Sequence, residues 1–295
     1  MTEAASNSQL PKRRVSIVVD SAATLPQGSQ ANVPLFIVPM SLVVDGRTYL
    51  DGVDLQASEF YDLLKQADKP TTTSAPSPER FLDAFRQASR VAESVLCITV
   101  SPRFSACYDA ARLGQEQARE EMAGFPVEVL DSGSAAAGEA LVAMEAIRAA
   151  ESGETLEAVT EAAKKAAEGV SILAFLDTLY YLWKGGRVPG IAHLGTSLLD
   201  LKPLFEMRLG ETKSLARPRT AKRAMRRLVE LMRERTGDAR VHVGVLHAAV
   251  PERAEELRAM VADEFDCAEL FTTEFSSVMG AHTGPGLLGL AFRPD

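Results

Sequence analysis

Two side chains well suited to ligand binding, His282 and Thr283, lie inside the glycine-rich stretch Gly280–Gly286. Three glycines and one proline in this stretch predict tight turns rather than a helix. A restricted backbone would hold an imidazole and a hydroxyl at fixed positions, which suits a polar or anionic headgroup. The same pattern also fits a structural loop that leads into a last buried strand.

Further hydroxyls follow segments that predict strands. Ser21, Ser101 and Ser132 each come soon after a short apolar or β-branched run. In an open α/β sheet, ligands bind outside the carboxyl ends of the strands, so hydroxyls recurring at one edge favour a polar site. Each serine taken alone is equally typical of a helix cap.

The elements that would position these groups alternate between strands and helices, which predicts an α/β fold with parallel strands. We expect strands over 15–19, 35–38, 95–99, 127–130, 170–176, 241–246, 270–274 and 287–292, and strand pairs over 41–50 and 204–216. We expect helices from 58 and over 79–90, 106–121, 135–150, 155–168, 179–184, 220–235 and 251–264. The interpretation is a loose N-terminus over 1–14, an N-terminal α/β domain over 15–169 and a C-terminal α/β domain over 170–295.

Composition and charge narrow the class of protein. The chain is 46% hydrophobic with a net charge of −8, so it is globular and a general nucleic-acid role is disfavoured. Residues 184–240 carry 14 Lys and Arg against 6 Asp and Glu, a net +8 by difference, which leaves −16 for the remainder. A local basic segment favours a specific anionic ligand or partner.

The three cysteines form no C-x-x-C pair, so neither a disulfide framework nor a metal site is predicted. No apolar run reaches the length of a membrane-spanning helix, and no apolar signal core follows the basic residues near the N-terminus. We therefore expect a cytoplasmic, soluble protein that contains no metal and no cofactor.

Taken together, several short motifs resemble the DegV family over nearly the whole chain. They are Asp20-Ser21, Lys69–Ser77, Ser101–Tyr108, Asp131-Ser132, Leu182–Arg187, Lys202–Leu204 and the His282 stretch. The resemblance implies a two-domain α/β protein, with a mainly parallel N-terminal sheet, that buries one long-chain fatty acid between or within its domains. It also implies a carrier without catalysis of its own, which presents the acid to a separate fatty acid kinase that makes an acyl phosphate. Transient contact with a membrane surface fits such a carrier.

Site residues follow from matching these motifs and from the need to pair a buried carboxylate with donors. The carboxylate would be held by Thr73, Ser74, Ser105, Ala106, His282 and Thr283. Phosphoryl transfer or partner contact would involve Arg187, Arg219 and His282. The apolar tail would lie against Phe175, Leu179, Leu194 and Leu198, although any one of these could be ordinary core.

The chain departs from the family pattern at two places. Ala75 stands where glutamine is common, and Ala106-Cys107 stands where Gly-Thr is usual. The hydroxyls of Thr73 and Ser105 are retained, so the departures bear more on headgroup geometry and on the kinase partner than on lipid binding.

Other classes of function remain as alternatives. An acyl hydrolase could combine Ser105 or Ser132 with His282 and Asp20, but no G-x-S-x-G elbow is present. A protein that binds another small anion also fits. A nucleotide kinase lacks its glycine-rich phosphate loop, and the basic segment lacks the interleaved aromatic residues typical of nucleic-acid binding.

Overall fold

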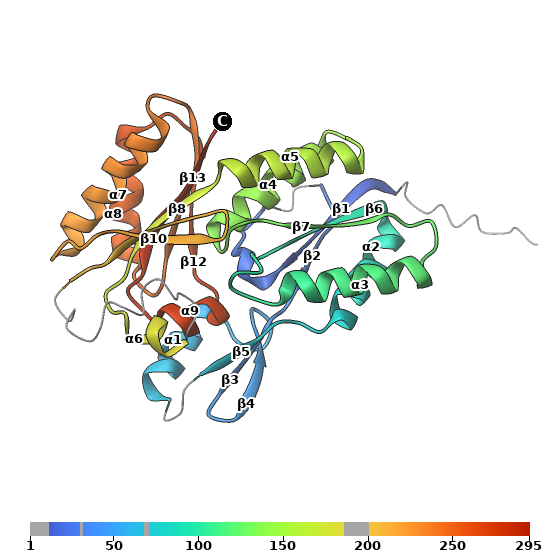
Figure 1. Ribbon diagram of the computed structural model, residues 1–295, viewed down its shortest axis with the longest axis horizontal. Coiled ribbons are helices and arrows are strands. Elements are labelled where there is room, and N and C mark those ends of the chain that lie inside the picture. Colours follow the sequence, from blue (N-terminus) through green and yellow to red (C-terminus); the bar gives the residue numbers. More distant parts are fainter. Residues whose placement is uncertain (1–11, 30–31, 68–70, 186–200) are drawn as a thin grey trace, which may run out of the picture.

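The computed structural model describes residues 12–29, 32–67, 71–185 and 201–295. Two large sheets enclose a pair of helices, α4 (Ala137–Glu151) and α5 (Leu156–Gly169), which pack against strands of both sheets. Further helices cover the outer face of each sheet (Figure 1). The expected α/β architecture, with a parallel N-terminal sheet, is therefore confirmed.

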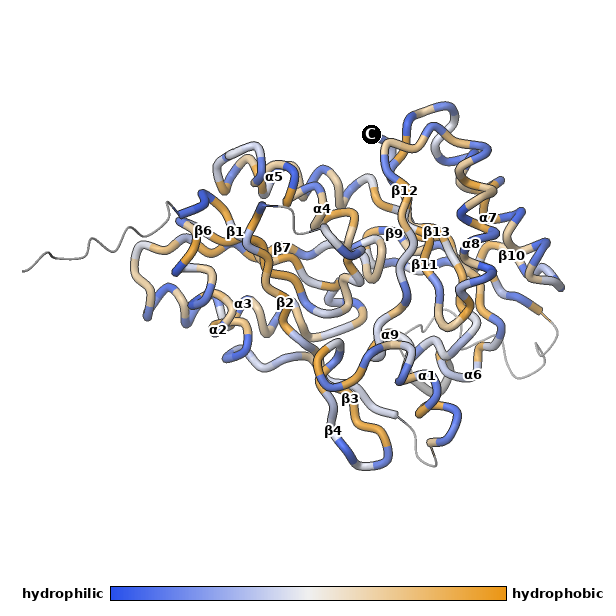
Figure 2. Tube along the Cα trace, turned by 180° about the vertical axis from the view of Figure 1, so that it is seen from behind, coloured by the Kyte–Doolittle hydropathy of each residue, from blue (hydrophilic) through white to orange (hydrophobic). Residues whose placement is uncertain are grey.

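The first sheet is parallel and covered by helices on both faces. Its strands, in spatial order, are β2 (Leu35–Val38), β1 (Arg13–Asp20), β6 (Ala92–Thr99) and β7 (Val127–Asp131). The outer helices are α2 (Pro78–Val91) and α3 (Cys107–Glu121). Because both faces are buried, its strands are nearly continuous in hydrophobic residues, and β1 and β6 stand out as hydrophobic in Figure 2.

The second sheet is mixed, with β11 and β12 parallel and its other neighbouring strands antiparallel. Its order is β10 (Glu211–Ala216), β9 (Leu204–Arg208), β8 (Ser171–Phe175), β13 (Leu288–Pro294), β11 (Val241–His247) and β12 (Cys267–Glu274). The helices α7 (Ala221–Thr236) and α8 (Pro251–Glu264) cover its outer face.

The alanine content of α4 follows from its position between the two sheets. Side chains on all sides of this helix are buried, and the atoms around Gly138 leave no room for a side chain at that position. A Cβ at Gly138 would lie 2.1 Å from Ser134 Oγ and 2.9 Å from Ile172 Cδ1. One hydrophobic cluster accordingly runs from the first sheet through α4 to the second. The domain boundary near residue 170 stays a prediction, since α4 and α5 precede it and contact both sheets.

A small antiparallel sheet lies at one end of the molecule, below the two large sheets in Figure 1. Its order is β4 (Arg47–Leu50), β3 (Ser41–Val44) and β5 (Thr72–Ser74). The hairpin is confirmed, with positive φ at Asp45 and Gly46. The strand β5 is not among the predicted strands, and residues 72–74 form it because they pair with β3.

Three short helices lie beside this sheet: α1 (Ala57–Gln66), α6 (Tyr180–Gly185) and α9 (Ser277–Thr283). The helix α9 corrects the prediction of turns through the glycine-rich stretch. Ser276 caps its N-terminus, and Gly280 lets the ring of Tyr61 pack against it, since a Cβ there would lie 2.7 Å from Tyr61 Oη. The turn begins only at Gly284, where φ is +67°.

Candidate lipid-binding cavity

A cavity of about 220 Å³ lies where the two large sheets meet the small sheet and α9. Eighteen of its 24 lining residues are apolar, so the space suits a hydrocarbon chain. The polar ones are Thr73, Ser74, Ser105, Thr212, His282 and Thr283. In the described parts of the chain, no Lys, Arg, Asp or Glu side chain lines it, so a buried anion there would rely on neutral donors and the imidazole.

Thr73 and His282 meet at the cavity wall. Thr73 Oγ1 lies 2.7 Å from His282 Nε2, a hydrogen bond whose direction depends on the imidazole tautomer. Pairing with Leu42 of β3 fixes Thr73 on β5, and His282 lies in the last turn of α9. Thr283 also lines the cavity, but its hydroxyl donates back to the carbonyls of Met279 and Gly284 at 3.3 Å. Thr73 and His282, both half-buried, therefore form a hydrogen-bonded polar pair at the cavity wall.

The N-termini of two long helices face the same cavity. Ser105 and Ala106 precede α3, and Ala135 and Ala136 precede α4. Free backbone N–H groups and the helix dipole make such positions favourable for an anion. Ser105 Oγ also lies 3.1 Å from Cys107 Sγ, which fixes the hydroxyl at the start of α3. The sequence motifs indicated Ser105 and Ala106 at the start of α3 as headgroup residues, but not Ala135 and Ala136 at the start of α4.

The family model described as "Uncharacterised protein, DegV family" matches residues 14–295. This chain belongs to the DegV family. A DegV domain-containing protein of Streptomyces coelicolor is 37% identical over 280 residues, which cover 94% of this chain and 98% of that protein. The resemblance predicted from the sequence motifs is confirmed.

Solved DegV structures share the whole fold. A fatty-acid-binding DegV family protein from Thermus thermophilus matches with a TM-score of 0.87 at 27% identity, covering 96% of this chain and 100% of that one. A stearic-acid-binding protein from Eubacterium ventriosum matches with a TM-score of 0.84 at 26% identity, covering 95% and 98%. The arrangement of sheets and helices is thus that of the DegV family.

The tail residues predicted from the DegV resemblance need correction. Phe175 is fully buried on the opposite face of β8, in the core beneath α7 and α8, and does not line the cavity. Its neighbours Ile172 and Ala174 line the cavity instead, because side chains alternate along a strand. Leu179 is partly buried against the main core, outside the cavity lining, and Leu194 and Leu198 lie outside the described residues.

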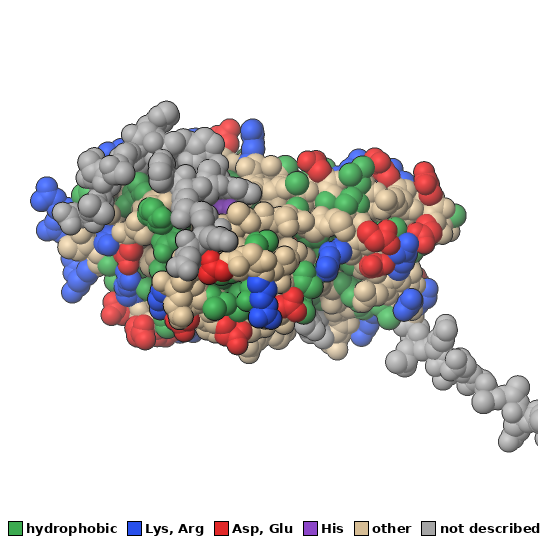
Figure 3. Space-filling model, turned by 90° about the horizontal axis from the view of Figure 1, so that it is seen from below, with side chains coloured by type: hydrophobic (Ala, Val, Ile, Leu, Met, Phe, Trp, Pro, Cys, Tyr) green, Lys and Arg blue, Asp and Glu red, His purple; other side chains and the backbone are tan. Residues whose placement is uncertain are grey.

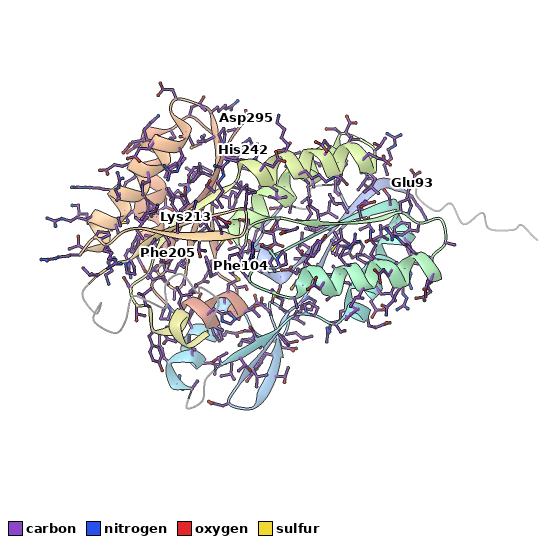
Figure 4. The ribbon with its side chains drawn as sticks, viewed as in Figure 1. Glu93, Phe104, Phe205, Lys213, His242 and Asp295 are labelled. Carbon is purple, nitrogen blue, oxygen red and sulfur yellow. The ribbon has the colours of Figure 1, made fainter. Side chains whose placement is uncertain are left out.

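Two aromatic side chains outside the four tail residues given above help to enclose the cavity. Phe104 follows β6 and Phe205 lies on β9; both are labelled in Figure 4, where they lie near the junction of the two large sheets. Phe205 pairs with Ala174 on the neighbouring strand, so the two side chains lie on the same face of the sheet. Strand alternation could therefore have placed Phe205 at the cavity once the face of β8 that borders the cavity was known. The sequence held no comparable signal for Phe104, which lies in a loop.

Of the three residues predicted for transfer, one lies away from the cavity and one lies outside the described chain. Arg219 is exposed just before α7 and does not line the cavity. Arg187 falls outside the described residues. Of this group, the structure brings His282 alone to the cavity among the residues it describes.

The serines at strand ends stabilise the fold instead of lining the cavity. Ser21 Oγ donates to Asp51 Oδ2 at 2.7 Å, and Asp51 Oδ1 accepts from Ser277 N at 3.0 Å, which fixes the start of α9. Ser101 and Ser132 are buried, and Ser132 Oγ donates to the carbonyl of Ser134 at 3.2 Å. The prediction of one polar site formed by these three serines was wrong.

A hydrolase triad is not assembled in this arrangement. His282 Nε2 contacts Thr73, while both carboxylate oxygens of Asp20 accept backbone N–H groups, from Ala22 and Val100, at 2.9 Å. Ser105 Oγ is directed to Cys107. Within the described chain, no cluster of three His, Cys, Asp or Glu side chains is arranged to hold a metal ion. The helices described are too short or too polar to cross a bilayer.

Proposed function

We propose that this protein binds one long-chain fatty acid in the cavity and presents its carboxylate to a separate kinase, which forms the acyl phosphate. The observation that carries the proposal is an apolar cavity with the Thr73–His282 pair at its wall. The protein acts here as a carrier, and the phosphoryl chemistry belongs to its partner.

The apolar lining accounts for the tail. A palmitoyl-sized acid has about fourteen methylenes, and burial at about 0.8 kcal/mol each gives a gross gain of roughly 11 kcal/mol. Ordering of the chain and loss of its translational freedom offset much of this gain. Side chains such as Ile172, Met207 and Leu246 supply the required surface without needing specific contacts.

The headgroup needs donors, since an unpaired buried carboxylate is costly. Thr73, His282 and Ser105 can each place a donor at the cavity, and the N-termini of α3 and α4 add favourable backbone dipoles. Ser74 and Thr283 complete the polar part of the lining. The fatty-acid-binding relatives from Thermus thermophilus and Eubacterium ventriosum support this ligand class at 27% and 26% identity.

The docking face for the kinase is proposed at the basic end of the molecule. Lys222, Arg223 and Arg226 are exposed on α7, and Arg219 is exposed just before it. Lys and Arg side chains gather at the end of the molecule that α7 and β10 form in Figure 3. Exposed charges of this kind mainly raise the rate of association with an acidic partner.

Mass spectrometry of the purified protein under native and denaturing conditions tests the ligand. We expect one fatty acid per chain in the native spectrum and its release on denaturation. Addition of the cognate fatty acid kinase and ATP should convert the bound acid to an acyl phosphate. A protein that is reproducibly empty and does not take up added fatty acid would contradict the proposal. Turnover of activated acyl esters without a kinase would instead favour a hydrolase.

A further inference from the structure

A buried carboxyl group lies close to the cavity and has no role in the function proposed above. Glu139 is 0% exposed, and neither of its carboxyl oxygens has a hydrogen-bond partner among the described residues. Its place in the first turn of α4 favours the charged form. Burial has the larger effect and raises the pKa of Glu139 well above its usual value, which favours the protonated form.

Asp20, at the end of β1, is the charged counterpart of Glu139. It is also 0% exposed, but its two oxygens accept the backbone N–H groups of Ala22 and Val100 at 2.9 Å. Burial raises the pKa of Asp20 to about 6 despite these hydrogen bonds. Asp20 loses its proton at a lower pH than Glu139, and its negative charge then raises the pKa of Glu139. Glu139 still holds its proton in that range, so it does not raise the pKa of Asp20.

Contacts connect Asp20 to the cavity on two sides. Its backbone donors Ala22 and Val100 are themselves lining residues. A hydrogen bond with Cys107 lowers the pKa of Asp20, and Cys107 Sγ lies 3.1 Å from Ser105 Oγ at the cavity. An anion bound near Ser105 would therefore be separated from the Asp20 carboxylate by little more than one buried thiol. In such a poorly solvated region, charges interact strongly.

Three other titratable groups interact electrostatically with Glu139. They are Cys97 on β6, Cys107 on α3 and Asp131 on β7. Towards the opposite end of α4, on the side of the second sheet, Glu145, Arg148, Glu269 and Arg293 form ion pairs, and His242 contacts Glu269. In Figure 4, His242 and Asp295 lie together at that end, far from Phe104.

A second recess borders Asp20 on the other side. Its volume is about 470 Å³, and Asp20, Asp51 and Glu274 line it together with several hydroxyls. Glu274 is only partly buried, so this recess is in contact with solvent there.

We propose that Asp20 and Glu139 form a proton-binding pair linked to the cavity, so that binding of an anionic lipid takes up a proton from solvent. The inference rests on the proposed function, because it requires an anion in the cavity. The proton adds to a carboxylate oxygen of Asp20, while Glu139 stays protonated, and no covalent bond of the ligand changes. The protein therefore holds the lipid more tightly as the pH falls through the titration range of Asp20.

Isothermal titration calorimetry in buffers with different heats of ionisation measures the proton uptake directly. Dodecanesulfonate is the probe, because its headgroup stays anionic and any proton taken up must bind to the protein; dodecanoate is the matched carboxylate. We expect uptake of a fraction of a proton per ligand near pH 6.5 in the unaltered protein. Asp20→Asn removes the carboxylate that takes up the proton with little change of shape, and we expect the proton uptake to disappear in this variant. Glu128→Gln, at an exposed position on β7, should behave as the unaltered protein.

A second readout does not depend on the ligand. Infrared spectra of the lipid-free protein should contain the C=O band of a protonated carboxyl group at neutral pH, and Glu139→Gln should remove it. Stoichiometric binding of both probes with the same heat in every buffer would overturn the proton linkage and leave the proposed function intact. If neither probe binds, both the proposed function and the proton linkage are contradicted.

Discussion

The two faces of the second sheet are built from adjacent residues of the same strands, yet one face is filled and the other borders a cavity. On the outer face, Phe175 is fully buried against α7 and α8. On the inner face, its neighbour Ala174 lines the cavity beside Phe205. The difference shows that hydrophobic residues in a strand do not by themselves predict a ligand site. A ligand site forms on the face of the sheet against which no other element packs closely.

Packing geometry explains why the inner face stays open. The helices α7 and α8 lie directly on the outer face, whereas α4 and α5 are shared with the first sheet. Beyond the N-terminus of α4, at Ala135 and Ala136, the space between the sheets is closed by the small sheet and by α9 instead. The cavity occupies this junction.

The largest effect should come from truncating the filled face. Phe175→Ala should lower the free energy of unfolding by about 3–5 kcal/mol, since it leaves a void in a packed core. Phe205→Ala, on the neighbouring strand, removes the same atoms from a wall that already borders empty space, so it should cost less than half as much. Urea unfolding of the lipid-free proteins measures both values. Equal losses would mean that the two faces are packed alike.

The next effect concerns the polar end of the open face. Thr73→Val combined with Ser105→Ala should weaken fatty-acid binding, because each hydrogen bond to a charged group contributes about 1.5–3 kcal/mol. Thr212→Val removes another cavity hydroxyl, from β10, and should leave the affinity nearly unchanged if the carboxylate lies where we propose. Fluorescence displacement or calorimetry provides the dissociation constants. If only Thr212→Val weakens binding, the carboxylate lies near Thr212 and not near Thr73 and Ser105.

A smaller change should shorten the space available to the tail. Ala174→Leu adds volume on the open face, and overpacking a fitted ligand costs about 1–3 kcal/mol. Binding of longer saturated acids should therefore fall more than that of shorter ones. As a control, Leu173→Met changes the filled face at similar volume and should not alter the chain-length profile. A uniform loss over all chain lengths in Ala174→Leu would indicate general damage to the fold.

The smallest effect should appear in the pH dependence of stability. Burial raises the pKa of both Asp20 and Glu139, so the folded protein keeps protons that the unfolded chain releases as pH rises. Stability contributed by the pair is therefore full below the usual carboxyl range and falls as pH rises through about 6 for Asp20. Glu139→Gln should gain stability relative to the unaltered protein as pH rises, whereas Glu128→Gln should not. Urea unfolding at several pH values tests this, and parallel curves would refute it.

Sequence patterns gave the elements reliably where the local signal was strong. Alternating apolar runs and helical patterns located the strands of the first sheet, and Asp45-Gly46 located the hairpin. The glycine-rich stretch misled, because helix α9 depends on a cap at Ser276 and on Tyr61 packing against Gly280, a contact between residues distant in sequence. Strand β5 was missed for the same reason, since it exists only through pairing with β3.

In the candidate site too, the sequence identified some residues correctly and misplaced another. Motifs identified Thr73, Ser105 and His282, and the structure places all three at one cavity. Phe175 was assigned to the tail pocket although its side chain lies on the opposite face of β8. Because side chains alternate at every residue, an error of one position reverses the assignment, and sequence alone does not state which face is covered.

The sequence by itself determined the family, the α/β class, most strands and helices, and the chemical types available to bind an anionic lipid. These depend on local periodicity, turn chemistry and short motifs, which are written along the chain. Only the tertiary structure decided that α4 lies between two sheets, that Thr73 and His282 meet across 209 positions at 2.7 Å, and that Glu139 is buried without a hydrogen-bond partner among the described residues. The physical reason is that burial and facing depend on which distant surfaces pack together, and no local pattern fixes that choice.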